Sequence, residues 1–147
     1  MGAKIQTFLI TFFLCTFAAK FLLMIVFNSL TDFVLKSKLF HKKWIKAVAE
    51  AEGYQVADIS YIFCDDDYLL ELNKKYLNHD TLTDIITFDY VEGTHLSGDI
   101  YISIERVREN ANIFDQSFER ELHRVLAHGV LHLCGYKDKS KNDSKLM

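Results

Sequence analysis

The stretch from residue 117 to residue 138 constrains the fold more than any other part of the sequence. Ser117 can cap a helix by accepting a hydrogen bond from a free backbone N–H, and acidic residues such as Glu119 favour the positive end of a helix. Apolar residues then recur at helical spacing as far as Leu133, and Gly135 can adopt the left-handed conformation that ends a helix. We therefore expect one long helix followed at once by a sharp turn.

Two histidines near the end of this helix form the pattern HxxxHxxGxxD with the turn that follows. His128 and His132 are four residues apart, so one helical face presents both imidazoles. A turn at Gly135 lets the chain fold back so that Asp138 reaches the same ion. Zinc accepts two imidazoles and a carboxylate, and a fourth position left for water is typical of a catalytic site. The sequence thus predicts one Zn²⁺ held by His128, His132 and Asp138.

Three neighbouring residues allow other interpretations. His123 precedes His128 by a rotation of about 500° at 3.6 residues per turn, so we expect it on another face, at the surface or supporting a metal ligand from behind. Cys134 is expected to be a buried structural thiol rather than a soft ligand. Gly129 occupies the position where the zinc-protease pattern HExxH needs a glutamate base, which argues against peptide hydrolysis by that mechanism.

The remaining segments alternate between strand and helix patterns, identified by β-branched and aromatic residues or by apolar residues at helical spacing. Strands are expected over Ile25–Phe27, Asp58–Cys64, Asp84–Tyr90 and Asp99–Ile104, and helices over Lys42–Glu52, from Asp65 toward Tyr76, from Glu105 to about Asn112, and from Ser117 to Leu133. This order predicts an α+β fold, or a three-layer arrangement, with a small mixed sheet of about four strands and about five helices. Gly93 and Gly98 are expected in the loop between the last two strands, and Asp99 at a turn or sheet edge.

The N-terminal segment differs from the rest. Residues 5–27 are apolar apart from a few small polar residues and Lys20, a length that could span a bilayer. The segment suits a signal-anchor helix, a cleavable signal peptide, or a translated extension upstream of a start at Met24. We expect residues 1–23 to be an apolar extension and residues 24–147 to form the domain, with membrane contact only if the extension is a genuine anchor.

The length and the net charge of the chain narrow the class of protein further. A chain of 147 residues is one domain, and a formal charge of −3 excludes binding of nucleic acid by bulk charge alone. A start at Met24 would remove two lysines and make the charge more negative still. The three cysteines are odd in number and far apart, which argues against a disulfide framework and favours a reducing, cytoplasmic location.

Three motifs resemble one known family. The motifs of the YbeY family are similar to three segments of this sequence: HGVLHLCGYKD (128–138), TDIITFDY (83–90) and SGDIYISI (97–104). Members of that family are metal-dependent endoribonucleases of ribosomal RNA maturation and ribosome quality control. The resemblance covers about residues 24–147. It implies a single-strand-specific endoribonuclease that acts at the 3′ end of small-subunit ribosomal RNA. The implied partners are ribosomal RNA, the small ribosomal subunit and associated ribosomal or GTPase factors, and no organic cofactor is implied.

The sequence departs from the family pattern HGxLHLxGYDH at the third metal ligand. Asp138 stands where the family has its third histidine, and Lys137 stands where the family usually has aspartate. A carboxylate can replace an imidazole, so the resemblance implies a surviving site with altered metal preference or affinity. The chain also ends earlier than the family's final helix, which suggests a truncated C-terminus.

A second departure concerns phosphate binding. Leu77 replaces the arginine that follows the tyrosine of the family's NxxYR motif. Lys75, Lys137 and Arg124 are our candidates for RNA contacts; Lys75 and Lys137 are equally compatible with ordinary solvated lysines.

Asp84 heads the TDIITFDY strand and is expected either to orient a ligand histidine or to cap a turn. Two other functions stay open from the sequence. One is a noncatalytic ribosome-associated factor whose metal stabilises the last helix and turn. The other is a small membrane-anchored metalloprotein.

Overall fold

The computed structural model describes residues 24–137, and residues 1–23 and 138–147, Asp138 among them, lie outside the described part. Four strands form one sheet: β1 (Met24–Ser29), β2 (Gln55–Cys64), β3 (Ile85–Asp89) and β4 (His95–Ser103). Their order in the sheet is β1-β2-β4-β3. β1 and β4 run parallel to β2, whereas β3 runs antiparallel to β4. The predicted mixed sheet of four strands is confirmed.

The helices of the described part are α2 (Lys38–Ala51), α3 (Asp66–Leu72), the π-helical turn η1 (Asn73–Leu77), α4 (Ile104–Ile113) and α5 (Phe118–Leu133). Each predicted helix is found, and the one expected from Asp65 toward Tyr76 divides into α3 and η1. The predicted α+β fold is thus confirmed. Within residues 24–137, no helix has the length and apolar character needed to cross a membrane.

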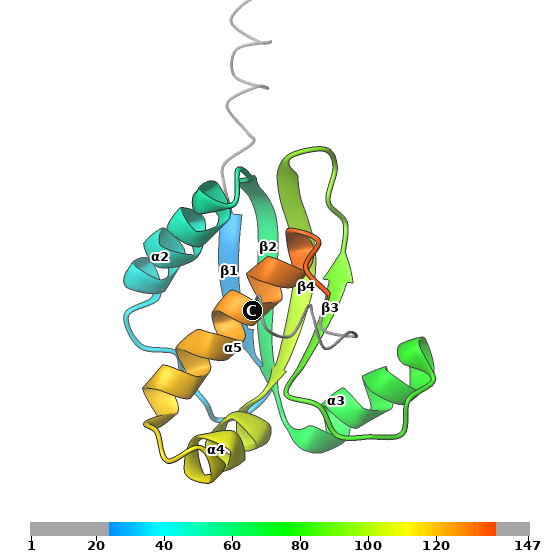
Figure 1. Ribbon diagram of the computed structural model, residues 1–147. Helices are drawn as coiled ribbons and strands as arrows, with labels where there is room; N and C mark the ends of the chain where they lie inside the picture. The colour runs from blue at the N-terminus through cyan, green and yellow to red at the C-terminus, as the bar shows by residue number, and fades with distance from the viewer. Residues whose placement is uncertain (1–23, 138–147) are drawn as a thin grey trace, which may run out of the picture.

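Helices cover both faces of the sheet to different extents (Figure 1). Alternate residues of β2, including Ile59 and Tyr61, point into the main core with residues of α2 and α5. The Tyr61 hydroxyl donates a hydrogen bond of 2.9 Å to the Leu126 carbonyl of α5 and so ties the helix to the central strands. On the opposite face, Leu69 of α3 packs against Ile86 of β3. α5 is therefore held across the sheet on one side, with α3 behind β3 on the other.

One expectation about β4 is wrong. Gly98 lies within the strand, not in the preceding loop, and Asp99 is paired with both Ser60 of β2 and Phe88 of β3, so it belongs to an interior strand. The glycine reflects close packing: a Cβ at position 98 would lie 2.5 Å from the Phe88 carbonyl oxygen and 2.7 Å from Cδ2 of Leu133. The close approach of α5 to the sheet requires glycine here.

The ends of α5 follow the sequence prediction. The Ser117 hydroxyl accepts a hydrogen bond of 3.2 Å from the Arg120 N–H, which caps the first turn. At the other end Gly135 has φ +95°, and the Tyr136 N–H donates to the Leu131 carbonyl at 3.1 Å, the pattern of a Schellman turn. The chain therefore reverses directly after the second histidine of the motif.

Two tyrosines tie this turn to the end of α2. The Tyr54 hydroxyl donates to the Cys134 carbonyl at 3.1 Å, and the Tyr136 hydroxyl donates to Oε2 of Glu52 at 2.7 Å. Both contacts join segments about eighty residues apart in the chain. The position of the turn is therefore set by tertiary contacts as well as by Gly135.

Candidate metal centre

The two histidines of the motif converge near the C-terminal end of α5. Nε2 of His128 and Nε2 of His132 are 2.7 Å apart, and the ring planes are nearly perpendicular. Nδ1 of His132 lies 3.0 Å from the carbonyl oxygen of Tyr136. Because a carbonyl only accepts, Nδ1 of His132 carries the proton and Nε2 is the nitrogen with a lone pair. Such a backbone hydrogen bond is the usual support of a metal-binding histidine.

This pair fits a zinc ion with a small adjustment. Two nitrogen ligands of a tetrahedral zinc ion with bonds of roughly 2.0–2.1 Å lie about 3.3 Å apart, so the rings of His128 and His132 need to part by about 0.6 Å. Among residues 24–137, no group of three or more histidine, cysteine, aspartate or glutamate side chains is placed to hold a metal ion. The described residues thus bring together the two histidines predicted as ligands, and the ligand set of His128, His132 and Asp138 stays a prediction.

Gly129, between the two histidines, faces the sheet. A Cβ at this position would lie 2.8 Å from Cγ2 of Ile100 and 3.1 Å from Cδ1 of Ile85. A glutamate there would meet the core and not the histidine pair. The structure thus gives a packing reason for the absence of the HExxH glutamate.

A cavity of about 420 Å³, which we call the β3 hollow, adjoins the histidine pair. It is lined by residues of β3 and its approach, of η1, and of the end of α5 and its turn, namely Leu77, Thr83, Asp84, Ile85, Ile86, Thr87, Asp89, His132, Tyr136 and Lys137. Two of the sequence motifs, TDIITFDY and HGVLHLCGYKD, therefore meet at one site. Leu77, at the family's arginine position, contributes an apolar side chain to the wall.

Asp84 and Arg124 form an ion pair at this site. Nη2 of Arg124 lies 2.8 Å from Oδ2 of Asp84 and 2.7 Å from Oε1 of Glu121. The Glu121 side chain is fully buried and also accepts a hydrogen bond of 2.6 Å from Gln116. Hydrogen bonding to Glu121, followed by the charges of Glu121 and Asp84, raises the pKa of Arg124 against the opposing effect of desolvation. Arg124 thus anchors the head of β3 to α5, and Asp84 directs its carboxylate at Arg124.

The predicted RNA contacts have different surroundings. The Arg124 side chain is 46% exposed, so its guanidinium is accessible although two carboxylates bind it. Lys137 is exposed and lines the β3 hollow. Lys75 is exposed on η1, with Nζ 5.0 Å from the centre of the Tyr76 ring.

His123 lies on the other side of α5 and is not part of the β3 hollow. Its Nε2 is 3.1 Å from Nε2 of His41 on α2. Burial and the neighbouring His41 lower the pKa of His123, while Glu119 acts in the opposite direction. The structure therefore places His123 in the contact between α2 and α5.

Cys134 is buried, as predicted for a structural thiol. Desolvation, with a smaller contribution from Glu52, raises the pKa of its thiol to about 11. A protonated thiol is a poor metal ligand.

Sequence reasoning missed two buried polar residues. In the sequence, Glu121 has the character of an acidic residue near the start of a helix, and its spacing of three from Arg124, which is that of an ion pair, is the signal that could have revealed its role. No local pattern in the sequence indicates that His41 is buried in a contact, because its partner His123 is 82 residues away.

Comparisons with known proteins agree with this geometry. The family described as "Endoribonuclease YbeY" matches residues 29–147. A curated relative with the same description from Flavobacterium psychrophilum is 57% identical over 124 residues, which cover 84% of this chain and 89% of the relative. One from Flavobacterium johnsoniae is 56% identical with the same coverage. The solution structure of TM1509 from Thermotoga maritima is 33% identical, covers 83% of each chain and has a TM-score of 0.56. The chain belongs to the YbeY family of endoribonucleases.

Proposed function

We propose that this chain is a metal-dependent endoribonuclease that cuts single-stranded RNA, with the 3′ end of small-subunit ribosomal RNA as its target in ribosome maturation and quality control. The observation that carries this proposal is the convergence of Nε2 of His128 and Nε2 of His132 beside a hollow lined by a second family motif. Relatives more than 50% identical are described as endoribonucleases, which favours an enzyme over a noncatalytic factor.

The metal is held by His128, His132 and Asp138 in this proposal, and two imidazoles with one carboxylate suit Zn²⁺. When bound, zinc lowers the pKa of a coordinated water toward about 7 and offsets negative charge on a phosphate. The chain's own contribution is positioning. The Tyr136 carbonyl fixes the tautomer of His132, and the Schellman turn directs the chain after Gly135 back toward the pair.

Cationic side chains at the rim orient the RNA backbone. Lys137 borders the hollow and Arg124 is reachable from solvent, so both can contact phosphate oxygens. Arg124 is the better placed to replace the family arginine lost at Leu77, because Asp84 and Glu121 hold its guanidinium in one orientation. A chain with a net charge of −3 depends on ribosomal RNA and factors of the small subunit for placement in the cytoplasm.

The decisive experiment measures zinc per chain and cleavage of single-stranded RNA by the full chain, by His132→Ala and by Asp138→Ala. Loss of a partner that merely supports a ligand typically costs about 10- to 100-fold in metal affinity or activity, so loss of the ligand His132 is expected to cost at least about 100-fold. His95→Ala, which removes an exposed histidine outside the β3 hollow, is the matched control and is expected to match wild type.

Two outcomes contradict parts of the proposal. If wild type holds one zinc per chain but cleaves RNA no faster than His132→Ala, the chain is not a nuclease at this site. If Asp138→Ala binds zinc with unchanged affinity, Asp138 is not the third ligand.

A further inference from the structure

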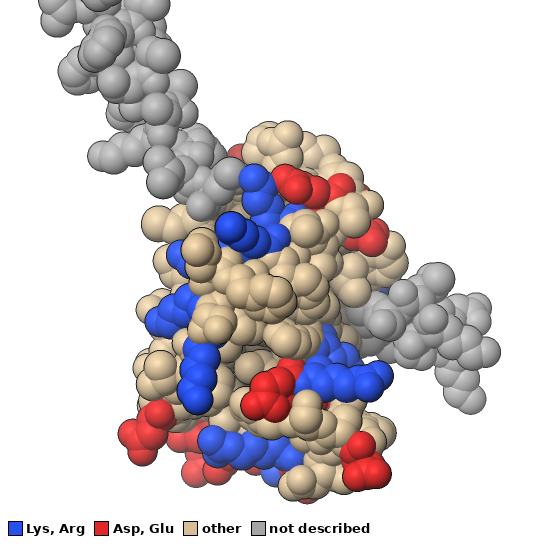
Figure 2. All heavy atoms as spheres, turned by 90° about the vertical axis from the view of Figure 1, so that its left-hand side faces the viewer, with Lys and Arg blue, Asp and Glu red and all other residues tan. Residues whose placement is uncertain are grey.

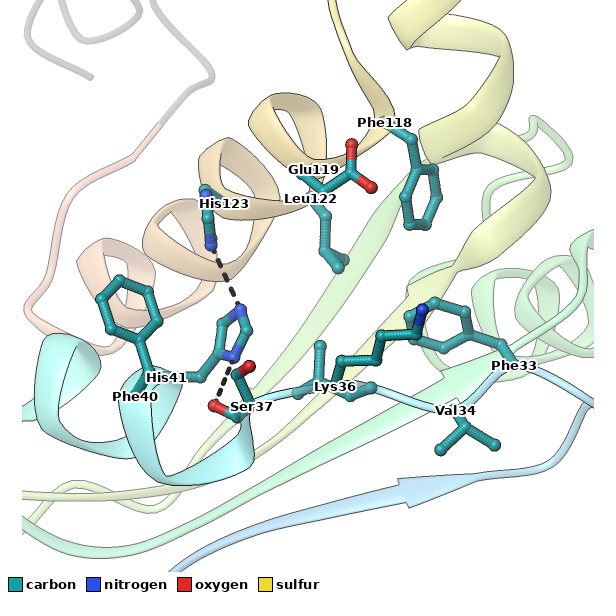
Figure 3. A pocket seen from close by; sticks show the side chains of 11 residues that line it. Phe33, Val34, Lys36, Ser37, Phe40, His41, Phe118, Glu119, Leu122 and His123 are labelled. Atoms are coloured by element: carbon teal, nitrogen blue, oxygen red, sulfur yellow. Dashed lines mark hydrogen bonds between the residues drawn. The ribbon is translucent and has the colours of Figure 1, made fainter.

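A second cavity, of about 400 Å³, lies on the side of α5 that faces α2 (Figure 3). We call it the α2 hollow; it is lined by residues 33–37 and by Phe40, His41, Phe118, Glu119, Leu122 and His123. It shares no lining residue with the β3 hollow. Nothing in the proposed chemistry uses it.

The segment that forms one wall of the α2 hollow carries a concentrated positive charge. Residues 33–49 contain five lysines and no acidic residue, although the whole chain has a charge of −3. Lys36 and Lys43 are exposed, as is Lys38 at the start of α2. Within residues 24–137, Lys46 is the only one of the five with an ion pair, at 3.6 Å from Glu50. Figure 2 shows basic side chains spread over this face of the molecule.

Aromatic rings stand at both ends of the hollow (Figure 3). Phe40 is 56% exposed, and its ring centre lies 6.1 Å from that of His123. At the other end the rings of Phe33 and Phe118 are 5.7 Å apart. Lys36 and Glu119 are the charged residues that line the hollow, and the other lysines follow on α2. The hollow and the adjoining surface of α2 therefore combine accessible π-faces with positive charge, the combination by which proteins bind single-stranded nucleic acid.

We propose that this face, made by Lys36, Phe40 and Lys43 and called here the α2 face, binds a single-stranded segment of the RNA substrate next to the segment in the β3 hollow. The proposal rests on the proposed endoribonuclease function for the identity of the nucleic acid. Lysines contact phosphates, and Phe40 stacks on a base without selecting its sequence. Val34 and Leu39 near Phe40 are also exposed, at 72% and 67%. RNA is favoured over an acidic protein or an anionic membrane because the proposed function already supplies a single-stranded RNA and Phe40 offers a ring on which a base can stack.

The exposed ridge of α5 connects the two hollows. At 100° per residue, Arg120 and Arg124 lie between the side of the helix that carries His123 and the side that carries His128. His132 lies nine residues after His123, which is a rise of about 13.5 Å along the helix. An RNA strand that crosses α5 beside these two arginines can reach both hollows.

The test measures binding of labelled single-stranded RNA of about 4 and about 12 nucleotides, a range taken from known single-strand sites. Binding is measured in the full chain carrying His132→Ala, so that cleavage does not interfere. The double variant Lys36→Gln with Lys43→Gln is expected to weaken binding of the longer RNA on the order of 10-fold. It should also lower the slope of log K against log salt by about 1.4, because each lost phosphate contact removes roughly 0.7. Binding of the shorter RNA should change little. Phe40→Ala should weaken the longer RNA on the order of 10-fold, as expected for one lost stacking contact.

The matched control is Gln55→Glu with Asn112→Asp, which changes the net charge by the same two units at exposed positions outside both hollows. Equal weakening by the control and by the lysine variant would overturn the proposal, because bulk charge would explain both. Unchanged RNA binding by the lysine variant would also overturn the proposal. If that variant binds RNA normally but loses activity on ribosomal particles, the α2 face binds a protein partner and the proposal is likewise overturned. Failure of wild type to cleave RNA would refute the nuclease but not the binding face, since binding is measured separately.

Discussion

Helix α5 carries both histidines of one pair on one side and one histidine of a second pair on the opposite side, and the pairs look alike at the level of single contacts. His128 and His132 bring their Nε2 atoms to 2.7 Å, and His41 and His123 bring theirs to 3.1 Å. In each pair one Nδ1 faces a backbone carbonyl, that of Tyr136 at 3.0 Å or that of Ser37 at 3.1 Å. Contact geometry alone therefore does not separate a metal site from a packing contact.

The surroundings separate them. The first pair lies within one turn of a helix, next to a chain reversal at Gly135. The second joins two helices; His41 is buried, and the Phe40 and Trp44 rings pack against His123. Because the Ser37 carbonyl only accepts, Nδ1 of His41 carries the proton and Nε2 of His41 accepts from the Nε2–H of His123. Both pairs form a hydrogen bond between ring nitrogens, and the first pair differs in that it adjoins the β3 hollow and the chain reversal at Gly135.

The largest effect that distinguishes the pairs is stabilisation by zinc. A ligand that binds only the folded state at about 100 times its dissociation constant adds about 2.7 kcal/mol to the free energy of unfolding. Zinc should raise the unfolding temperature of wild type and of His123→Ala, and should have no such effect on His132→Ala. Thermal unfolding with zinc and with a chelator measures this. Protection of His132→Ala with loss of protection in His123→Ala would reverse the assignment.

Removal of Arg124, on the side of α5 toward the pair of His128 and His132, should have the next largest effect on stability. Arg124→Ala leaves the buried Glu121 carboxylate without its main partner and should lower the free energy of unfolding by about 1.5–3 kcal/mol. Urea unfolding measures the change. Arg120→Ala is the control, because only its backbone N–H takes part in the cap at Ser117, and it should stay within about 0.5 kcal/mol of wild type. Equal effects of the two variants would remove the anchoring role from Arg124.

Local patterns in the sequence predicted the elements and the first histidine pair. Ser117 and Gly135 marked the ends of α5, and the spacing of His128 and His132 put both rings on one face, because capping and helical periodicity depend only on residues within a few positions. Gly98 was misplaced for the same reason. Its role depends on Leu133 and on the Phe88 carbonyl, and a local rule treats glycine as a loop residue.

Contacts between distant segments could not be predicted. The pairing of His41 with His123, and that of Arg124 with Asp84, require knowledge of which faces of α2, α5 and β3 meet. Periodicity did exclude His123 from the face of His128, but it gave no information on what His123 contacts instead. The difference between the two histidine pairs is thus a tertiary property.

The smallest expected effect is a dependence of stability on pH that arises from His123 of the second pair. Burial, and then the neighbouring His41, lower the pKa of His123 in the folded state, against a smaller opposing effect of Glu119. In the unfolded chain the pKa of His123 is about 6.5, so below that pH the unfolded chain binds more protons than the folded chain. The stabilisation is therefore fully present above pH of about 6.5 and is lost as the pH falls toward and through the lowered pKa of His123.

His123→Gln tests this, since glutamine keeps an N–H donor for Nε2 of His41 but does not titrate. Between pH of about 7 and 5, the free energy of unfolding of wild type should fall more steeply than that of His123→Gln. The difference between the two slopes should stay below about 1.4 kcal/mol per pH unit, the limit for one proton. The two proteins differ only at position 123, so the difference between their urea-unfolding curves isolates the histidine. His95→Gln removes an exposed histidine and should follow wild type. If His123→Gln has the same pH dependence as wild type, the second pair carries no proton-linked stability and acts only through packing.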